Sequence, residues 1–162
     1  MQISIRPPTP DDQEFLLELY ADMRVDIRQA SHLTPEQRRQ LIESQFAAQS
    51  EHYRTHFPQA DRGIVVYGNT PIGRLDLNRT GEEILVMELG LRTAYQGQGI
   101  GSQLLRAVQE EARVTDRRVR LHVEKQNPAL NFYLAHGFGW LGEKEMHWEL
   151  QWPAQAGTPE PW

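Results

Sequence analysis

The sequence contains no cysteine. This absence excludes disulfide bonds, thiolate metal sites and a cysteine nucleophile. It also fits a reducing compartment, and we therefore expect a cytoplasmic protein.

The sequence also lacks an excess of basic residues and any long apolar run. Its 17 lysines and arginines are outnumbered by 22 aspartates and glutamates, which gives a net charge of −5. We therefore expect no nucleic-acid partner, and we interpret the short basic cluster at Arg117, Arg118 and Arg120 as solvated surface. No apolar run can span a bilayer, and the first residues do not resemble a signal peptide, so we expect no membrane association.

A chain of 162 residues is most simply one domain with a core of its own. We expect that domain to cover residues 1–152. The remainder, 153–162, is rich in proline, glycine and alanine, which predicts a disordered C-terminal tail.

Hydrophobic periodicity predicts where strands and helices lie. Alternating or β-branched apolar residues predict strands at 2–6, 62–67, 72–78, 83–91, 119–124, 138–141 and 144–150. Apolar residues at helical spacing predict helices at 11–27, 35–55, 99–115 and 127–135. Thr34 and Pro35 form a helix start, because threonine caps a helix and proline fits its first turn. Gly142 and Glu143 are expected to turn the last hairpin.

The order of these elements predicts a mixed α/β fold. Short turns join the three strands between 62 and 91, so these strands should form an antiparallel meander. The strand at 83–91, the next helix and the strand at 119–124 should form a right-handed crossover with parallel flanking strands. We therefore expect a mixed, mostly antiparallel sheet with helices on both faces.

The crossover contains a turn with glycines at alternate positions, Gly97, Gly99 and Gly101. Glycine has no Cβ and tolerates positive φ, so such a turn allows a close approach to the backbone. The amides that open the next helix have no intrahelical partner, and the helix dipole adds positive potential there. The turn therefore predicts a site for an anion, most often a phosphate or diphosphate.

Two known phosphate-binding motifs do not match this turn. A P-loop would have lysine after its last glycine, whereas Gly101 is followed by Ser102 and Gln103. A dinucleotide-binding turn has the spacing G-x-G-x-x-G near the first strand of a doubly wound fold, whereas this turn is G-x-G-x-G and follows an antiparallel meander. A purely structural glycine turn stays open as an alternative.

Two blocks of the sequence resemble the GNAT superfamily of acetyl-CoA-dependent N-acetyltransferases. The segment from Gln96 to Gly101 matches the signature Q/R-x-x-G-x-G/A of that family. The second block, N-x-A…(F/L)Y…GF, is matched by Asn127-Pro128-Ala129, Phe132-Tyr133 and Gly137-Phe138. The resemblance covers residues 72 to about 152. One departure is Thr93, where many members place proline, and threonine should permit the same turn.

The resemblance implies a GNAT-like fold and an N-acetyltransferase that moves an acetyl group from acetyl-CoA to a primary amine. The amine would attack the bound thioester directly in a ternary complex, because no cysteine can carry the acetyl group. The alternative is a non-catalytic acyl-CoA-binding or regulatory module on the same scaffold. A more distant option is a nucleotide-binding protein that uses the same loop.

The resemblance also implies which residues hold acetyl-CoA. Loop and helix amides would bind the diphosphate, strand backbone would pair with the pantetheine arm, and one side chain would hydrogen-bond that arm from the other side. These residues are Leu89, Leu91, Gln96, Gly97, Gln98, Gly99, Ile100, Gly101, Ser102 and Asn127. We expect no metal, because His52 and His56 have a ligand-like spacing but no evident third ligand.

By the same resemblance, Tyr133 is the candidate acid for the leaving thiolate and Glu88 the first candidate base. The structural alternatives are a packed aromatic ring for Tyr133 and, for Glu88, a pair with an arginine such as Arg74. Glu124 and His122 are second candidates for the base, and a chain of waters could replace any of them.

The acceptor is expected to be a small-molecule or peptide amine, and a homodimer is possible by the same resemblance. The family usually builds its acceptor cleft from the first two helices, so Gln45, Gln49, Tyr53 and Phe57 are candidate lining residues. A half-buried amphipathic helix face explains their spacing equally well.

Overall fold

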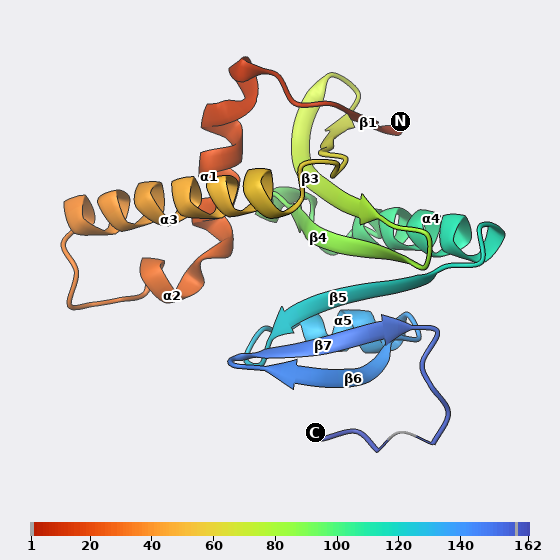
Figure 1. Cartoon of the computed structure of the whole chain (residues 1–162). Helices are drawn as coiled ribbons and strands as arrows, with labels where there is room; N and C mark the ends of the chain where they lie inside the picture. Colours follow the sequence, from red (N-terminus) through yellow and green to blue (C-terminus); the bar gives the residue numbers. More distant parts are fainter. Residues whose placement is uncertain (1, 158) are drawn as a thin grey trace. The chain divides into compact units, whose positions relative to one another are not determined.

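The computed structural model describes residues 2–157 and 159–162. Its strands follow the order β1-β2-β3-β4-β5-β7-β6 (Figure 1). β4 and β5 pair in parallel, whereas the pairs β1–β2, β2–β3, β5–β7 and β6–β7 are antiparallel. The expected mixed, mostly antiparallel α/β fold is therefore confirmed.

The described residues form two compact units. The first comprises Met1–Asp76 and Leu89–Gln98, and the second comprises Leu77–Glu88 and Gly99–Trp162. The strands β3 (Thr70–Arg79) and β4 (Glu83–Leu91) contribute residues to both units. Each unit is described by itself below.

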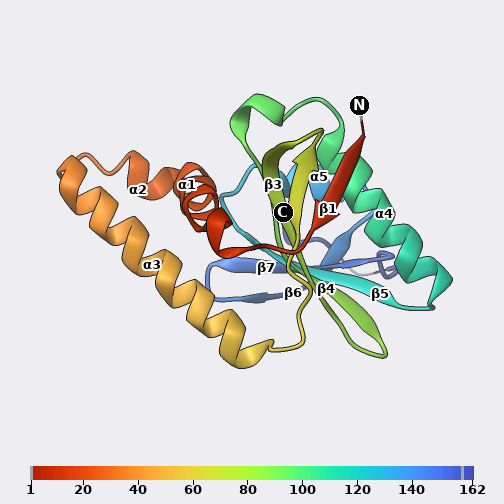
Figure 2. The ribbon, with the colours of Figure 1, turned by 90° about the horizontal axis from the view of Figure 1, so that it is seen from above.

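In the first unit, helices pack on a short antiparallel sheet formed by β1 (Ile3–Arg6), β2 (Ile64–Tyr67) and the first part of β3. Helix α1 (Gln13–Met23) contacts the long helix α3 (Pro35–His56); the two cross in Figure 1, and in Figure 2 α1 is seen nearly end-on beside α3. Their core cluster consists of Phe15, Leu16, Leu19, Ile64 and Val66, with Phe46 packed against it.

The predicted start of α3 is confirmed in atomic detail. The Thr34 hydroxyl accepts the Gln37 backbone N–H at 3.1 Å, and the Gln37 side chain accepts the Thr34 N–H at 2.9 Å. This reciprocal capping box satisfies two amides that the helix itself leaves unpaired.

The single helix expected at 11–27 is wrong. The segment begins with the 3-10 turn η1 (Pro10–Asp12), and α1 is separated from α2 (Val25–Arg28) by Arg24, whose ψ of 67° is not helical. The Arg24 guanidinium bonds the Asp26 carboxylate at 2.8 and 3.0 Å and the Tyr20 hydroxyl at 2.7 Å. Residues two apart do not face each other on a helix, so the pair with Asp26 stabilises the break.

A buried carboxylate joins β1 to the start of α1. Asp12 accepts two hydrogen bonds from the Arg6 guanidinium, at 2.8 and 2.9 Å, and the backbone N–H of Thr9 at 2.7 Å. These donors, Arg6 first, hold the pKa of Asp12 well below its usual range. The first turn of α1 is thereby fixed to the sheet of its unit.

In the second unit, β4 and β5 (Arg118–Glu124) are joined through α4 (Ile100–Val114), which contacts β5. The parallel pairing confirms the predicted crossover. Val119, Leu121 and Val123 of β5 are buried, and the residues between them are more exposed. The helix α5 (Ala129–Ala135) also contacts β5.

The last hairpin is formed by β6 (Gly139–Lys144) and β7 (His147–Trp152), so the turn expected at Gly142 and Glu143 is wrong. The turn lies at Glu145 and Met146, where Glu145 adopts a positive φ of 55°. Gly142 instead lies within β6, where the register with β7 shifts between Trp140 and Gly142. A glycine inside a strand often marks such a bulge, and hydrophobic pattern alone does not separate it from a turn.

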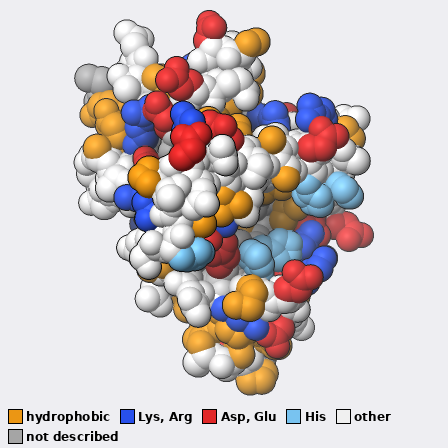
Figure 3. Space-filling model, turned by 90° about the vertical axis from the view of Figure 1, so that its left-hand side faces the viewer, with side chains coloured by type: hydrophobic (Ala, Val, Ile, Leu, Met, Phe, Trp, Pro, Cys, Tyr) orange, Lys and Arg blue, Asp and Glu red, His pale blue; other side chains and the backbone are white. Residues whose placement is uncertain are grey.

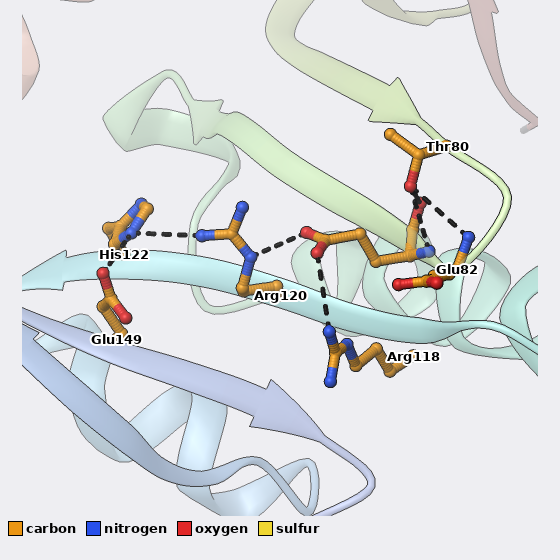
Figure 4. A network of polar contacts seen from close by, with 7 residues as sticks. Thr80, Glu82, Arg118, Arg120, His122 and Glu149 are labelled. Atoms are coloured by element: carbon orange, nitrogen blue, oxygen red, sulfur yellow. Dashed lines mark hydrogen bonds and ion pairs between the residues drawn. The ribbon is translucent and has the colours of Figure 1, made fainter.

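Charged side chains connect β4, β5 and β7 on the exposed face of β5 (Figure 4). Arg120 Nε donates to the Glu83 carboxylate at 2.6 Å, and Arg118 lies 3.9 Å from the same group. His122 Nε2 lies 3.2 Å from Glu149 Oε1. The basic cluster expected to be solvated is thus largely paired with acids of its own unit.

Within residues 2–157 and 159–162, no helix combines the length and the apolar character needed to cross a membrane.

Candidate functional site

The glycine turn adopts the left-handed backbone that its sequence predicts. Gly97 has a φ of +73° and Gly99 a φ of +83°. Gly99 is the N-cap of α4, and its carbonyl accepts the Gln103 N–H at 3.0 Å. No side chain caps this helix end. The amides of the first turn of α4 therefore have neither intrahelical partners nor a capping side chain.

The space outside the turn is open. A Cβ added to Gly97 or Gly99 would meet no atom within 4 Å. Glycine is therefore needed at these positions for its backbone conformation rather than for lack of room. Uncapped amides beside unfilled space, at the positive end of a helix of four turns, form a site for an anion.

Two glutamine side chains hold the backbone that precedes the turn. Gln96 Nε2 donates to the Leu91 carbonyl at 2.9 Å, and Gln98 Nε2 donates to the Ala94 carbonyl at 2.8 Å. Both bonds stabilise the segment that contains the 3-10 turn η2 (Thr93–Tyr95). This turn begins at Thr93, so threonine permits it where proline is common. Both side chains are thus used within the loop, and the loop presents its backbone outward.

The ladder between β4 and β5 is short. It pairs Glu83 with Arg118 through to Val86 with Leu121, whereas β5 continues to Glu124. The two parallel strands therefore stop pairing before β5 ends. Separated strands leave backbone groups that an extended ligand can bind as an added strand would.

Tyr133 lies on α5 with only 9% of its surface exposed. Its ring packs against Phe132 and Phe138, at centroid distances of 5.3 and 5.7 Å. Burial, and secondarily the negative charge of Glu88, raises the pKa of Tyr133 to about 12. The phenol therefore stays protonated across the physiological range, and it can donate a hydrogen bond or act as a weak acid.

The structure thus brings the two predicted catalytic residues into one electrostatic environment. Glu88 lies on β4 and Tyr133 on α5 of the same unit, and the charge of one acts on the ionisation of the other. Arg74, the alternative partner considered for Glu88, is paired with Asp76. No sequence signal connects Glu88 with Tyr133, because the two belong to separate elements and their link depends on the tertiary fold.

Asn127 opens α5. Its Oδ1 accepts the Ala129 N–H at 2.9 Å, and its backbone N–H donates to the Glu124 carbonyl at 2.9 Å. The side-chain oxygen is therefore occupied, and the side-chain NH₂ is the group with which Asn127 can reach a ligand.

The remaining candidates lie in different surroundings. His122 is bonded to Glu149 and also lies 3.4 Å from Arg120 (Figure 4), and Glu124 is exposed on the same strand. Gln45 accepts a hydrogen bond from Arg24, which gives it a role in joining α3 to the end of α1. Tyr53 and Phe57 contact each other edge to face at 6.2 Å. His52 and His56 stack at 4.2 Å, and within the described part of the chain no three metal-ligating side chains are grouped.

A family model described as "Acetyltransferase (GNAT) domain" matches residues 59–139 of the chain. No curated protein is similar enough in sequence to count as a relative.

Solved structures share the fold. The PaiA N-acetyltransferase of Thermoplasma acidophilum, in complex with coenzyme A, superposes with a TM-score of 0.70 at 21% identity, covering 93% of this chain and 98% of that one. A GNAT family acetyltransferase of Elizabethkingia anophelis with acetyl-CoA bound gives 0.57 at 18% identity, covering 92% and 96%. The Naa50 protein of Arabidopsis thaliana, in complex with the bisubstrate analogue CoA-Ac-MVNAL, gives 0.59 at 16% identity, covering 93% and 98%.

Replacing Glu88 by glutamine should lower the pKa of Tyr133, because the amide carries no charge to oppose the phenolate. Burial is the larger cause and remains, so the pKa should stay above the ordinary value of about 10. A pH titration of carbon-13-labelled tyrosine by NMR measures it. Glu124→Gln, an exposed acid on β5, is the matched control and should leave the pKa unchanged. A Tyr133 pKa that does not respond to Glu88→Gln would contradict the assigned coupling.

Proposed function

The chain belongs to the GNAT acetyltransferase family, and we propose that it moves an acetyl group from acetyl-CoA to a primary amine. The amine attacks the thioester directly while both substrates are bound. With no cysteine in the sequence, no thiol of the protein can carry the acetyl group in between. We further propose that residues 1–152 act as one acetyltransferase domain and 153–162 as its tail.

The observation that carries this proposal is the uncapped start of α4 behind two left-handed glycines. In our proposal the amides of Gln98, Gly99, Ile100, Gly101 and Ser102 bind the diphosphate of coenzyme A. Gln96 and Gly97 shape the approach. The helix dipole favours the negative charge, and the open space over the turn leaves room for it. Two of the similar structures contain coenzyme A or acetyl-CoA, which supports this ligand.

The pantetheine arm would then lie along the end of β4. The Leu91 carbonyl already accepts the Gln96 side chain, so we place most of the pairing on the backbone of Leu89, with Leu91 in support. The Asn127 NH₂ is the group with which this residue would donate a hydrogen bond to coenzyme A. Backbone pairing of this kind fixes an extended ligand along its length, and thereby fixes the position of the thioester.

In the chemical step, a bond forms between the amine nitrogen and the carbonyl carbon, and the carbon–sulfur bond breaks. Glu88 accepts the proton that the nitrogen loses. Tyr133 donates a hydrogen bond to the departing sulfur. A thiol has a pKa of about 8.5, so a phenol with a pKa of about 12 stabilises the thiolate without giving up its proton completely.

The electrostatic interaction between Glu88 and Tyr133 would help the leaving group depart. The negative charge of Glu88 raises the pKa of Tyr133. Once Glu88 takes up the proton of the amine, that charge is gone and the phenol becomes a stronger donor. The donor to the leaving group is thus strengthened as the carbon–sulfur bond breaks.

The acceptor is a small-molecule or peptide amine. The bisubstrate analogue bound to the Arabidopsis protein contains a peptide, which supports a peptide among these acceptors. On the face shown in Figure 3, acidic and basic side chains are interspersed. Recognition of the acceptor would then rest on individual side chains rather than on a broad field of one sign.

The substitution Gly101→Trp should weaken acetyl-CoA binding by at least about 100-fold, because the indole covers amides that make several charge-assisted hydrogen bonds. Gly101 lies within α4 and has no positive φ, so the helix should tolerate the change. Isothermal titration calorimetry measures the affinity. Gly81→Trp, at an exposed turn with open space around its Cβ, is the matched control. Undiminished affinity in Gly101→Trp would count against the loop as the binding site.

The substitution Tyr133→Phe should lower kcat by about 100-fold and leave the Kd of acetyl-CoA within about twofold, because only the donor to the sulfur is removed. Thiol release with a panel of amines measures turnover. Tyr67→Phe keeps the ring that contacts Tyr95 and should match the unchanged enzyme. Equal turnover in Tyr133→Phe would remove the donor role. Acetyl-CoA binding by the unchanged chain without turnover of any amine would instead indicate a non-catalytic module.

A further inference from the structure

A cavity of about 530 Å³ lies in the first unit, where α1, α3, β2 and β3 meet. Its volume is in the range of small-molecule sites. None of its lining residues belongs to the set proposed to bind acetyl-CoA or to act on it. The cavity therefore calls for an explanation of its own.

A buried ion pair forms part of the cavity wall. Arg74 and Asp76 alternate on β3, so both side chains lie on one face of the strand, and only 7% and 2% of their surfaces are exposed. Each oxygen of the Asp76 carboxylate has a partner, because Oδ2 accepts the Arg74 guanidinium and Oδ1 accepts the Gly63 N–H. A buried ion pair does not by itself indicate a gain in stability, because apolar residues of similar size commonly stabilise a protein equally well.

The guanidinium of this pair is incompletely satisfied. Arg74 Nε is buried and has no hydrogen-bond partner. Guanidinium offers five N–H donors in a fixed plane, and Asp76 accepts a hydrogen bond from Nη2, which leaves the neighbouring Nε–H without an acceptor. An acceptor brought to the Nε edge would complete the hydrogen bonding of Arg74, with a small shift of the side chain to expose that edge.

Arginines outnumber acids around the cavity, and the rest of its wall combines apolar residues with the polar Gln13 and Ser50. Arg54 and Arg62 line it and are exposed, and Arg54 is paired with Glu51. Leu16, Phe46 and Ile64 supply the apolar part of the lining. The only acid among the lining residues is Asp76, and its charge is already matched by Arg74.

We propose that this cavity binds a small organic carboxylate. The carboxylate pairs with Arg74 and with the arginines at the rim, and the apolar body of the ligand packs against Phe46 and Leu16. One carboxylate oxygen can accept the unpaired Nε–H of Arg74, and the negative charge of the ligand is complementary to the arginines at the rim. The site does not depend on acetyl transfer, so the two proposals can fail separately.

The first test compares three probes on the full chain: benzoate, its neutral counterpart benzamide, and inorganic phosphate. Calorimetry and thermal unfolding should show saturable binding of benzoate that raises the Tm, weakens as salt is added, and persists with saturating coenzyme A. Benzamide should bind at least about tenfold more weakly, because it lacks the charge. Equal binding of benzamide, binding of phosphate alone, or no binding of benzoate would overturn the proposal.

The second test uses matched arginines of α3. Arg54 and Arg39 are both exposed and each pairs with a glutamate three residues earlier, but only Arg54 lines the cavity. Arg54→Gln combined with Arg62→Gln should weaken benzoate binding by about fivefold, and Arg39→Gln should leave it unchanged. Arg74→Lys, which keeps a cation for Asp76 but removes Nε, should weaken it by about tenfold. Equal effects of the cavity and control variants would overturn the assignment. If Arg74→Lys proves unstable, the comparison of Arg54→Gln combined with Arg62→Gln against Arg39→Gln still tests the proposal, because these arginines are exposed.

Discussion

The proposed binding of acetyl-CoA depends on backbone amides that have no partner within helix α4. A helix always leaves its first amides without partners, and most proteins cover them with a capping side chain. Here the N-cap is a glycine with positive φ, no side chain caps the helix, and the space outside is open. The turn follows β4 after the 3-10 turn η2, and the side chains of Gln96 and Gln98 bond to the backbone of the same loop, so they do not cover these donors.

A second constraint is the burial of Tyr133. A phenol in an apolar environment resists ionisation, and a nearby carboxylate increases that resistance. The same carboxylate is the group to which we assign the proton of the amine. In our proposal, burial makes the loss of the phenol proton still less favourable, and the charge of Glu88 would make the strength of the donor depend on the progress of the reaction. Both effects require an interior of low dielectric, which the core around Phe138 supplies.

Local chemistry explains what the sequence could predict. The Thr34 cap, the strand at Glu83–Leu91 and the glycine turn are specified by residues next to one another, and the structure has them where the sequence places them. The break at Arg24 and the hairpin turn at Glu145 depend on a side-chain pair and on a bulge, which hydrophobic periodicity does not register. The coupling of Glu88 to Tyr133, and the cavity beside Arg74, depend on elements that meet only in the folded chain. The sequence does contain a pattern that could have predicted the buried pair of Arg74 and Asp76, namely two opposite charges at alternate positions among the apolar residues of β3.

The most direct measurement is a proton–nitrogen NMR titration of the backbone amides with coenzyme A, compared with pantetheine, which lacks the diphosphate. The account predicts that coenzyme A shifts the amide resonances of Gly99, Ile100, Gly101 and Ser102 more than those elsewhere in α4, and that pantetheine leaves these four unchanged. Saturation with coenzyme A while these four resonances stay in place would contradict it.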